Sequence, residues 1–102
     1  MAYYLVRAQP GHQLAELKKR LDSGEIAQMR PFGGEMQGCL LNARLDVDGW
    51  ATWEENCYCN PPLNQEREVL DTYFSGLTTE TIGKGEGWQA VDKLPSLWTL
   101  LK

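Results

Sequence analysis

The stretch CLLNARLDV (residues 39–47) and the stretch ATWEENCYC (residues 51–59) decide the fold that we predict from the sequence. In the first stretch the odd positions hold Cys, Leu, Ala, Leu and Val, and the even positions become polar after Leu40. The second stretch also carries most of its apolar side chains at odd positions, with Glu55 as the exception. A period of two is typical of a strand with one buried face. The two stretches therefore predict two neighbouring strands whose odd residues face the core.

Asp48 and Gly49 lie between these two predicted strands and mark a turn. A two-residue turn would place odd residues of one strand beside even residues of the other, because a slip of one residue reverses the two faces. A loop of three or five residues keeps the apolar faces together. We therefore expect such a loop, with Gly49 in the left-handed conformation and Arg44 opposite Thr52 or Glu54.

Helix and strand signals flank this predicted hairpin on both sides. Leu14, Leu17 and Leu21 lie at helical spacing, and Gly24 is a natural end for that helix. Gly, Pro and Asn residues, which break regular structure, separate the remaining predicted elements. We predict a strand at 2–8, a strand at 26–32, a helix at 63–75 capped by Gly76, a strand at 77–82, a short run at 88–91 and a helical turn after Pro95.

This order predicts an α+β protein with a ferredoxin-like βαββαβ sandwich. A four-stranded antiparallel sheet would carry two helices on one face, followed by a short C-terminal helical turn. The chain of 102 residues is the length of one domain, so we predict a single α+β domain over residues 1–102.

The segment from the first strand to the end of the first helix resembles the small YCII-related proteins. In that family a strand leads to a helix that begins near a histidine and ends at a glycine, here His12 and Gly24. The resemblance implies a dimeric ferredoxin-like fold and, in that family, a later acidic residue that completes a His–Asp site. Cys59 and Asn60 stand in this chain where that acidic residue is expected, so we use the resemblance as a fold analogy.

Composition excludes several classes of protein. The formal net charge is −4 and the Lys and Arg residues are scattered, so binding to nucleic-acid phosphates is not expected. The amino terminus has neither a signal-peptide pattern nor a membrane span, which predicts a cytoplasmic protein that does not bind membranes. An odd number of cysteines without an export signal favours reduced thiols.

The three cysteines are the weak candidates for a metal site. Cys57 and Cys59 lie two residues apart on one face of the predicted strand, and Cys39 would lie opposite one of them. Zinc normally takes four ligands, and this spacing lacks the usual CxxC pattern. Small buried cysteines in a core explain the same residues, so we predict neither a metal nor a cofactor.

Candidates for a ligand or interface site fall on the predicted outer sheet face and in one connector. Trp50 and Tyr58 would share that outer face with Arg44, a mixture of aromatic and polar side chains that is typical of a dimer contact. Arg30 lies in a connector with two glycines and, together with Arg44, could line a pocket for a small anionic ligand.

His12 and Glu55 are the candidate titratable groups. His12 is the single histidine and would supply a base near neutral pH. Glu55 occupies an apolar face, so it reaches solvent at the sheet edge, pairs with Arg7, Arg30 or His12, or lies buried at a pocket or interface. If it is buried, it becomes the first candidate for a functional site.

Three functional hypotheses follow. We favour a non-enzymatic binding or protein-interaction module that self-associates through its sheet face as a homodimer, or binds another protein. The alternative is a small-molecule enzyme or sensor with a concave pocket that uses His12, Glu55 and a cysteine. The third is a thiolate metal site. Substrate and pathway are not readable from these residues.

Overall fold

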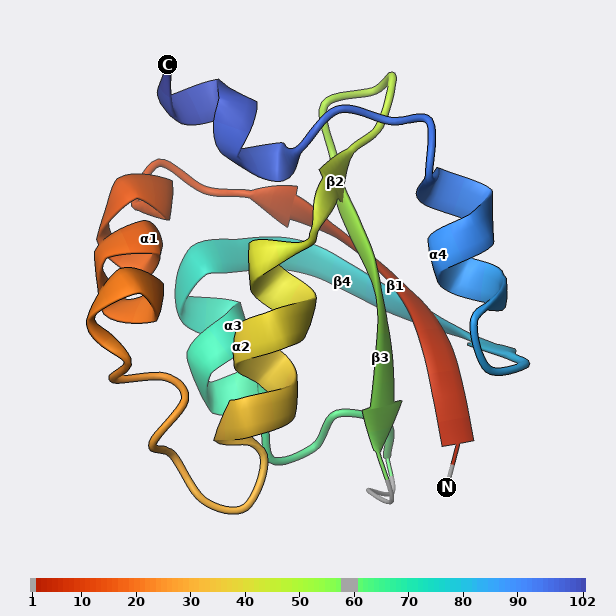
Figure 1. Cartoon of the computed structure of the whole chain (residues 1–102), viewed down its shortest axis with the longest axis horizontal. Coiled ribbons are helices and arrows are strands. Elements are labelled where there is room, and N and C mark those ends of the chain that lie inside the picture. Colours follow the sequence, from red (N-terminus) through yellow and green to blue (C-terminus); the bar gives the residue numbers. More distant parts are fainter. Residues whose placement is uncertain (1, 58–60) are drawn as a thin grey trace.

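The computed structural model describes residues 2–57 and 61–102 and shows helices packed around a twisted antiparallel sheet (Figure 1). The strands have the order β2-β3-β1-β4. The elements in chain order are β1 (Ala2–Pro10), α1 (Leu14–Ser23), α2 (Gly33–Leu41), β2 (Arg44–Leu45), β3 (Ala51–Cys57), α3 (Arg67–Tyr73), β4 (Phe74–Ile82), α4 (Glu86–Val91) and the 3-10 helix η1 (Leu97–Leu101).

Strand β1 is central and pairs with β3 on one side and with β4 on the other. Val6 lies opposite Trp53 in β3 and opposite Thr79 in β4. The even residues Tyr4, Val6 and Ala8 of β1 are buried, while Tyr3, Leu5 and Arg7 between them are half-buried. This alternation places the main core on the even face of β1 and the odd face of β3.

The predictions for the first strand and the first helix are confirmed. Helix α1 buries Leu14, Leu17 and Leu21, the three leucines at helical spacing. It ends at Gly24, which has a φ of 84° and donates its backbone N–H to the carbonyl of Leu21. Glycine adopts this left-handed conformation without a steric penalty, so it suits the end of the helix.

The strand predicted over residues 39–47 is wrong for most of its length, because residues 33–41 form helix α2. Met36, Cys39, Leu40 and Ala43 are all buried, and they follow the spacing i, i+3, i+4 and i+7 of one helix face. The same residues therefore fit both the two-residue period of a strand and the spacing of a helix, and in the folded protein they form the helix. The strand predicted at 26–32 is also wrong, since this segment forms turns that lead into α2.

The predicted hairpin loop is confirmed in its five-residue form. Leu45 pairs with Ala51 and Arg44 with Thr52, so residues 46–50 form the loop. Gly49 has a φ of 83°, as expected for its left-handed position. The Asp46 side chain accepts a hydrogen bond from the backbone N–H of Trp50 at 3.0 Å, which closes the loop. Cys39 lies on α2, outside this strand pair.

The second predicted helix is shorter than expected. Helix α3 runs from Arg67 to Tyr73, and β4 begins directly at Phe74. Gly76 is therefore not a helix cap. It lies inside β4 with a φ of 61°, and an added Cβ would lie 3.2 Å from the Trp50 ring. The terminal helical turn is confirmed as η1, and the run at 88–91 belongs to α4.

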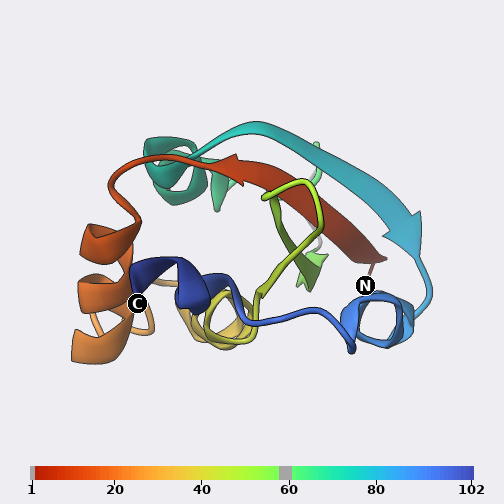
Figure 2. The same ribbon diagram turned by 90° about the horizontal axis from the view of Figure 1, so that it is seen from above.

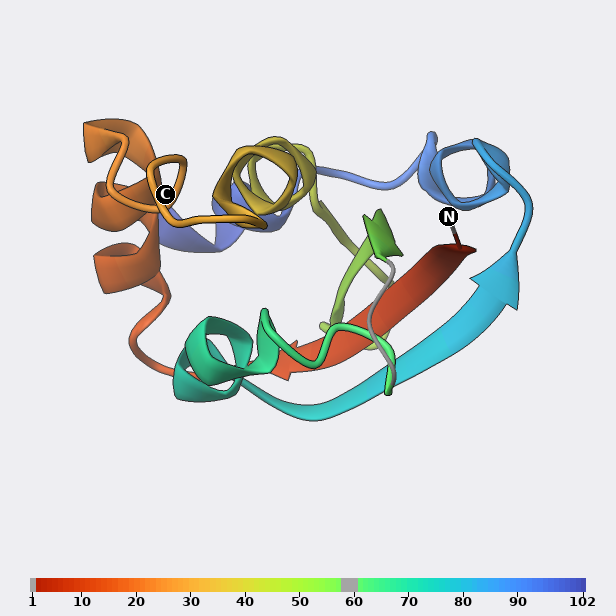
Figure 3. The ribbon, with the colours of Figure 1, turned by 90° about the horizontal axis from the view of Figure 1, so that it is seen from below.

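The coarse fold prediction, an α+β protein with a four-stranded antiparallel sheet, is confirmed. The order βαββαβ is not, because α2 precedes β2 and because α4 and η1 follow β4. The prediction of two helices on one face is too simple. Figures 2 and 3 show α2 and α4 on the side of β3, α1 beyond α2 at one end of the molecule, and β4 as the opposite edge of the sheet. Within the described ranges no helix is long and apolar enough to cross a membrane.

Candidate functional site

A groove lies between α2 and α4, alongside the part of β3 that extends past β2. Strand β2 pairs with β3 at Ala51 and Thr52 and then ends, whereas β3 continues to Cys57. Both α2 and α4 contact this strand. Two adjoining cavities of about 610 and 320 Å³ result, and they share Glu35, Cys39 and Trp88. We call these two cavities together the α2–α4 groove.

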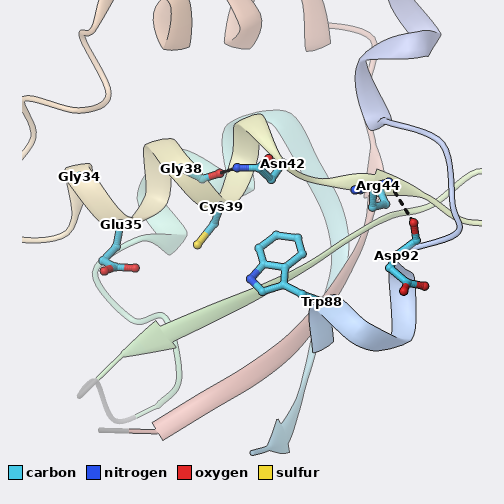
Figure 4. A pocket seen from close by; sticks show the side chains of 8 residues that line it. All are labelled: Gly34, Glu35, Gly38, Cys39, Asn42, Arg44, Trp88 and Asp92. Atoms are coloured by element: carbon cyan, nitrogen blue, oxygen red, sulfur yellow. Dashed lines mark hydrogen bonds between the residues drawn. The ribbon is translucent and has the colours of Figure 1, made fainter. Parts of the chain in front are cut away.

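The larger cavity is lined by side chains from three elements (Figure 4). Glu35 and Cys39 come from α2, Arg44 from β2, and Trp88 from α4. The Cys39 side chain points from α2 toward the space beside the Trp88 indole. The smaller cavity adds Glu54 and other residues of β3. Segments far apart in the sequence thus form one concave surface.

Glu54 is a buried carboxylate that holds α4 in place. It is 6% exposed and accepts hydrogen bonds from the backbone N–H groups of Gly85 at 3.0 Å and Gly87 at 2.8 Å. A longer bond of 3.4 Å comes from the N–H of Trp88. The first N–H groups of a helix have no partner within the helix, so a carboxylate placed there satisfies them. Glu54 therefore has a structural role that positions the Trp88 wall of the groove.

Glu55 points to the opposite face of β3 from Glu54, as adjacent strand residues must. Both residues line the smaller cavity, because β2 pairs with β3 only at Ala51 and Thr52 and leaves this edge of β3 open. Glu55 is 2% exposed. Its Oε1 accepts a hydrogen bond of 2.8 Å from Nε1 of Trp53. Burial raises its pKa to about 8, the nearby carboxylates of Glu66 and Glu35 add to the effect, and the Trp53 bond opposes it. At neutral pH this side chain is mainly a neutral carboxylic acid.

Cys39 is a free, buried cysteine on the α2 wall. Burial raises the pKa of its thiol, and the charges of Glu55, Glu35 and Glu54 raise it further. The thiolate is the reactive form of cysteine, and these surroundings suppress it. Cys39 is therefore a neutral, apolar part of the groove wall and not a nucleophile.

Two glycines of α2 line the groove without any need in the fold. An added Cβ at Gly34 or at Gly38 would meet no atom within 4 Å. Gly33, by contrast, is required, since its Cβ would lie 2.2 Å from the carbonyl oxygen of Ile26. Glycine in a helix costs about 0.5–1 kcal/mol relative to alanine. The packing of this chain does not explain why Gly34 and Gly38 carry that cost.

Arg44 closes one end of the groove. Its Nη1 donates hydrogen bonds to the backbone carbonyl of Leu94 at 2.7 Å and to that of Asp92 at 3.5 Å. These bonds hold the segment that follows α4 against β2. The guanidinium group therefore already has hydrogen-bond partners within the protein. Arg30 is exposed in the connector before α2 and does not line this cavity with Arg44.

The structure separates the other predicted site residues. His12 is exposed just before α1 and lines a different cavity of about 450 Å³ with residues that include Tyr73. Trp50 is half-buried, with the Arg7 guanidinium 4.3 Å above its ring. Tyr58 lies outside the described residues. Glu55 is buried and lines a cavity, so the alternative that it reaches solvent at the sheet edge is wrong, and its role as a site residue stays a prediction.

The three cysteines are not brought together as a described metal site. Cys57 is disulfide-bonded, so the expectation of a reduced thiol is wrong at this position. Its sulfur lies 3.8 Å from Oε2 of Glu66, on the face of β3 that also carries Glu55. Cys59 lies outside the described residues. Among the residues that the structure describes, no group of three His, Cys, Asp or Glu side chains could hold a metal ion.

One feature of the sequence indicates the groove, but the alternating apolar pattern of residues 39–47 favoured a strand there and hid it. Gly34 and Gly38 are four residues apart, which places them on one face of a helix once residues 33–41 are read with helical period. Trp88 follows a glycine-rich loop and was not a candidate, because nothing in the sequence links it to Glu55 or Cys39. Comparison with protein-family models, curated proteins and solved structures finds no match for this chain.

Proposed function

We propose that this protein is a small-molecule-binding domain whose ligand occupies the α2–α4 groove. The observation that carries the proposal is Glu55, an acidic residue that is almost fully buried and yet lines a cavity. A buried carboxyl group is costly to the fold, so its place at a cavity points to a ligand that uses it.

The groove has the dimensions and composition of a ligand site. Binding pockets for small molecules commonly have volumes of about 300–1,000 Å³ and combine apolar walls with a few polar groups. The two cavities of about 610 and 320 Å³ fall in this range. Trp88 supplies an aromatic wall, and Glu35 and Glu55 supply polar groups. We propose binding and not catalysis, since the Cys39 thiol stays protonated and His12 lines another cavity.

A fragment screen on ¹⁵N-labelled protein tests this proposal. Compounds that bind should shift the backbone signals of Gly34, Gly38 and Glu35 and the indole N–H signal of Trp88. The variant Gly38→Leu should abolish these shifts, because its side chain fills open space in the groove. The matched control Ala15→Leu adds the same side chain at an exposed position of α1. Fragments that shift only signals outside the groove, or that bind Gly38→Leu unchanged, would refute the proposal.

Self-association through the sheet face is a second proposal. Tyr3 and Ile82 lie opposite each other on β1 and β4 and are half-buried, as is Leu5 on the same face. These apolar groups favour a contact with a second copy. Native mass spectrometry tests it: a dimer that the variant Leu5→Lys converts to a monomer supports the contact, and a wild-type monomer contradicts it.

We also propose that the fold is an elaborated ferredoxin-like sandwich. The support is that β1, α1, β2, β3, α3 and β4 keep the order βαββαβ once α2 and α4 are set aside. An experimental structure in which β2 or β4 occupied another place in the sheet would contradict it.

A further inference from the structure

We propose that the ligand of the α2–α4 groove is a flat organic cation that stacks between the Trp88 indole and the glycine face of α2, with its charged group at Glu55. This inference rests on the proposed function and adds the chemical class of the ligand. Amidinium groups, guanidinium groups and protonated amino-heterocycles all belong to this class.

The shape of the groove supports a flat ligand. Gly34 and Gly38 leave two open positions on the α2 wall, beside the side chains of Glu35 and Cys39, and no protein atom lies within 4 Å of where their Cβ atoms would be. The Trp88 ring forms another wall, projecting from α4 (Figure 4). Glycines on a helix permit close approach of another molecule to the backbone. An aromatic or other planar group fits such a space better than a branched one.

The charges of the groove support a cation. The Glu54 carboxylate accepts hydrogen bonds from backbone N–H groups of α4, and Arg44 donates to backbone carbonyls. Lys84 is an exposed cation at the smaller cavity. Glu35 is exposed and Glu55 is buried, and both line the smaller cavity beside Trp88. The electron-rich face of an indole attracts cations, most strongly when water is excluded. A positively charged ligand therefore finds two carboxyl groups and an aromatic face in one place.

Binding of a cation is expected to be coupled to the ionisation of Glu55. The titratable groups around this side chain are Glu35 and Cys39 from α2, Glu66 before α3, Tyr4 across the sheet, and Glu54 and Lys84 at the cavity. With a pKa of about 8, Glu55 is ionised to roughly one tenth at pH 7 and roughly nine tenths at pH 9. A cation prefers the ionised form, so its affinity should rise about tenfold between these pH values.

Benzamidine is a suitable probe, because it is planar and remains cationic over this pH range. Benzamide has nearly the same shape without the charge, and benzoate carries the opposite charge. In NMR titrations at pH 8, benzamidine should shift the signals of Gly34, Gly38 and the Trp88 indole. Its dissociation constant should be at least about tenfold lower than that of benzamide, and it should fall about tenfold from pH 7 to pH 9.

Three variants test the roles of the groups. Glu55→Gln should weaken benzamidine binding at pH 9 and remove its dependence on pH, because the amide cannot ionise. Gly38→Ala should weaken binding while the protein becomes no less stable, since its methyl group enters the space of the ligand. Glu80→Gln removes an exposed carboxylate of β4 and should leave binding unchanged.

Each outcome bears on one of the two proposals. If benzamide or benzoate binds in the groove as tightly as benzamidine, the ligand class is wrong and the small-molecule function stands. The ligand class is equally wrong if benzamidine does not bind in the groove, if its affinity is the same at pH 7 and pH 9, or if Glu55→Gln leaves that affinity and its pH dependence unchanged. Failure of the whole fragment screen to reach the groove would refute the proposed function itself.

Discussion

Replacing Glu55 with glutamine should change how the stability of this protein depends on pH. The glutamine has almost the same shape and can still accept the hydrogen bond from Trp53, but it cannot ionise. In the native protein burial holds the pKa of Glu55 at about 8, against its ordinary value of 4.5. The folded state therefore retains a proton that the unfolded chain loses above about pH 4.5.

The sign and size of the effect follow from proton linkage. Below pH 4.5 both states carry the proton, and Glu55 imposes no ionisation cost on folding. As the pH rises from about 4.5 to about 8, the ionisation of Glu55 should remove about 1.4 kcal/mol of stability per pH unit from the wild-type protein, or about 5 kcal/mol in all. Since domains of this size are stable by about 5–15 kcal/mol, the loss should be easy to measure.

Urea denaturation followed by tryptophan fluorescence, at intervals between pH 5 and pH 8, measures this effect. The free energy of unfolding of Glu55→Gln should exceed that of the wild type by an amount that grows by about 2.5 kcal/mol from pH 5 to pH 7. The exposed Glu80→Gln variant serves as the control and should follow the wild type. Parallel pH profiles for Glu55→Gln and the wild type would show that Glu55 is ionised in the folded protein and would refute this reasoning.

Three further measurements test the groove and its supports. Gly33→Ala should lower the free energy of unfolding by about 1–3 kcal/mol, because its Cβ would collide with the Ile26 carbonyl. Gly34→Ala should raise the free energy of unfolding by about 0.5–1 kcal/mol, since its Cβ meets no other atom. Thermal melts that rank the two variants in the other order would contradict the packing described. Glu54→Ala should cost about 1–3 kcal/mol and speed amide hydrogen exchange in α4, since its backbone N–H groups lose their acceptor; unchanged exchange would show that this carboxylate does not hold the helix. Cys39 should react with iodoacetamide much more slowly at pH 8 in the native protein than in urea, and equal rates would contradict a buried thiol of raised pKa.

The sequence was sufficient where one local signal stood without competition. Leu14, Leu17 and Leu21 predicted α1, and Gly24 predicted its end, because helical spacing and a left-handed cap are both short-range features. The odd-length loop around Gly49 was predicted from the need to keep apolar faces together. These elements depend on neighbours within a few residues in the chain.

Residues 33–43 show where sequence reasoning failed. Their apolar side chains fit both an alternating strand and a helix with buried residues at 36, 39, 40 and 43. Short apolar runs allow both periods, and the choice depends on what packs against them. The same ambiguity hid the groove, because Gly34 and Gly38 share a face only if the segment is helical.

The sequence by itself determined an acidic α+β chain, its first strand and helix, the hairpin loop and the suspicion attached to Glu55. These are consequences of composition and of patterns a few residues long. The tertiary structure alone decided that β3 is buried on both faces, that Glu54 anchors α4, and that Glu55, Cys39 and Trp88 line one cavity. The physical reason is that burial, charge proximity and cavity shape arise from contacts between segments that are remote in the chain, and no local pattern encodes those contacts.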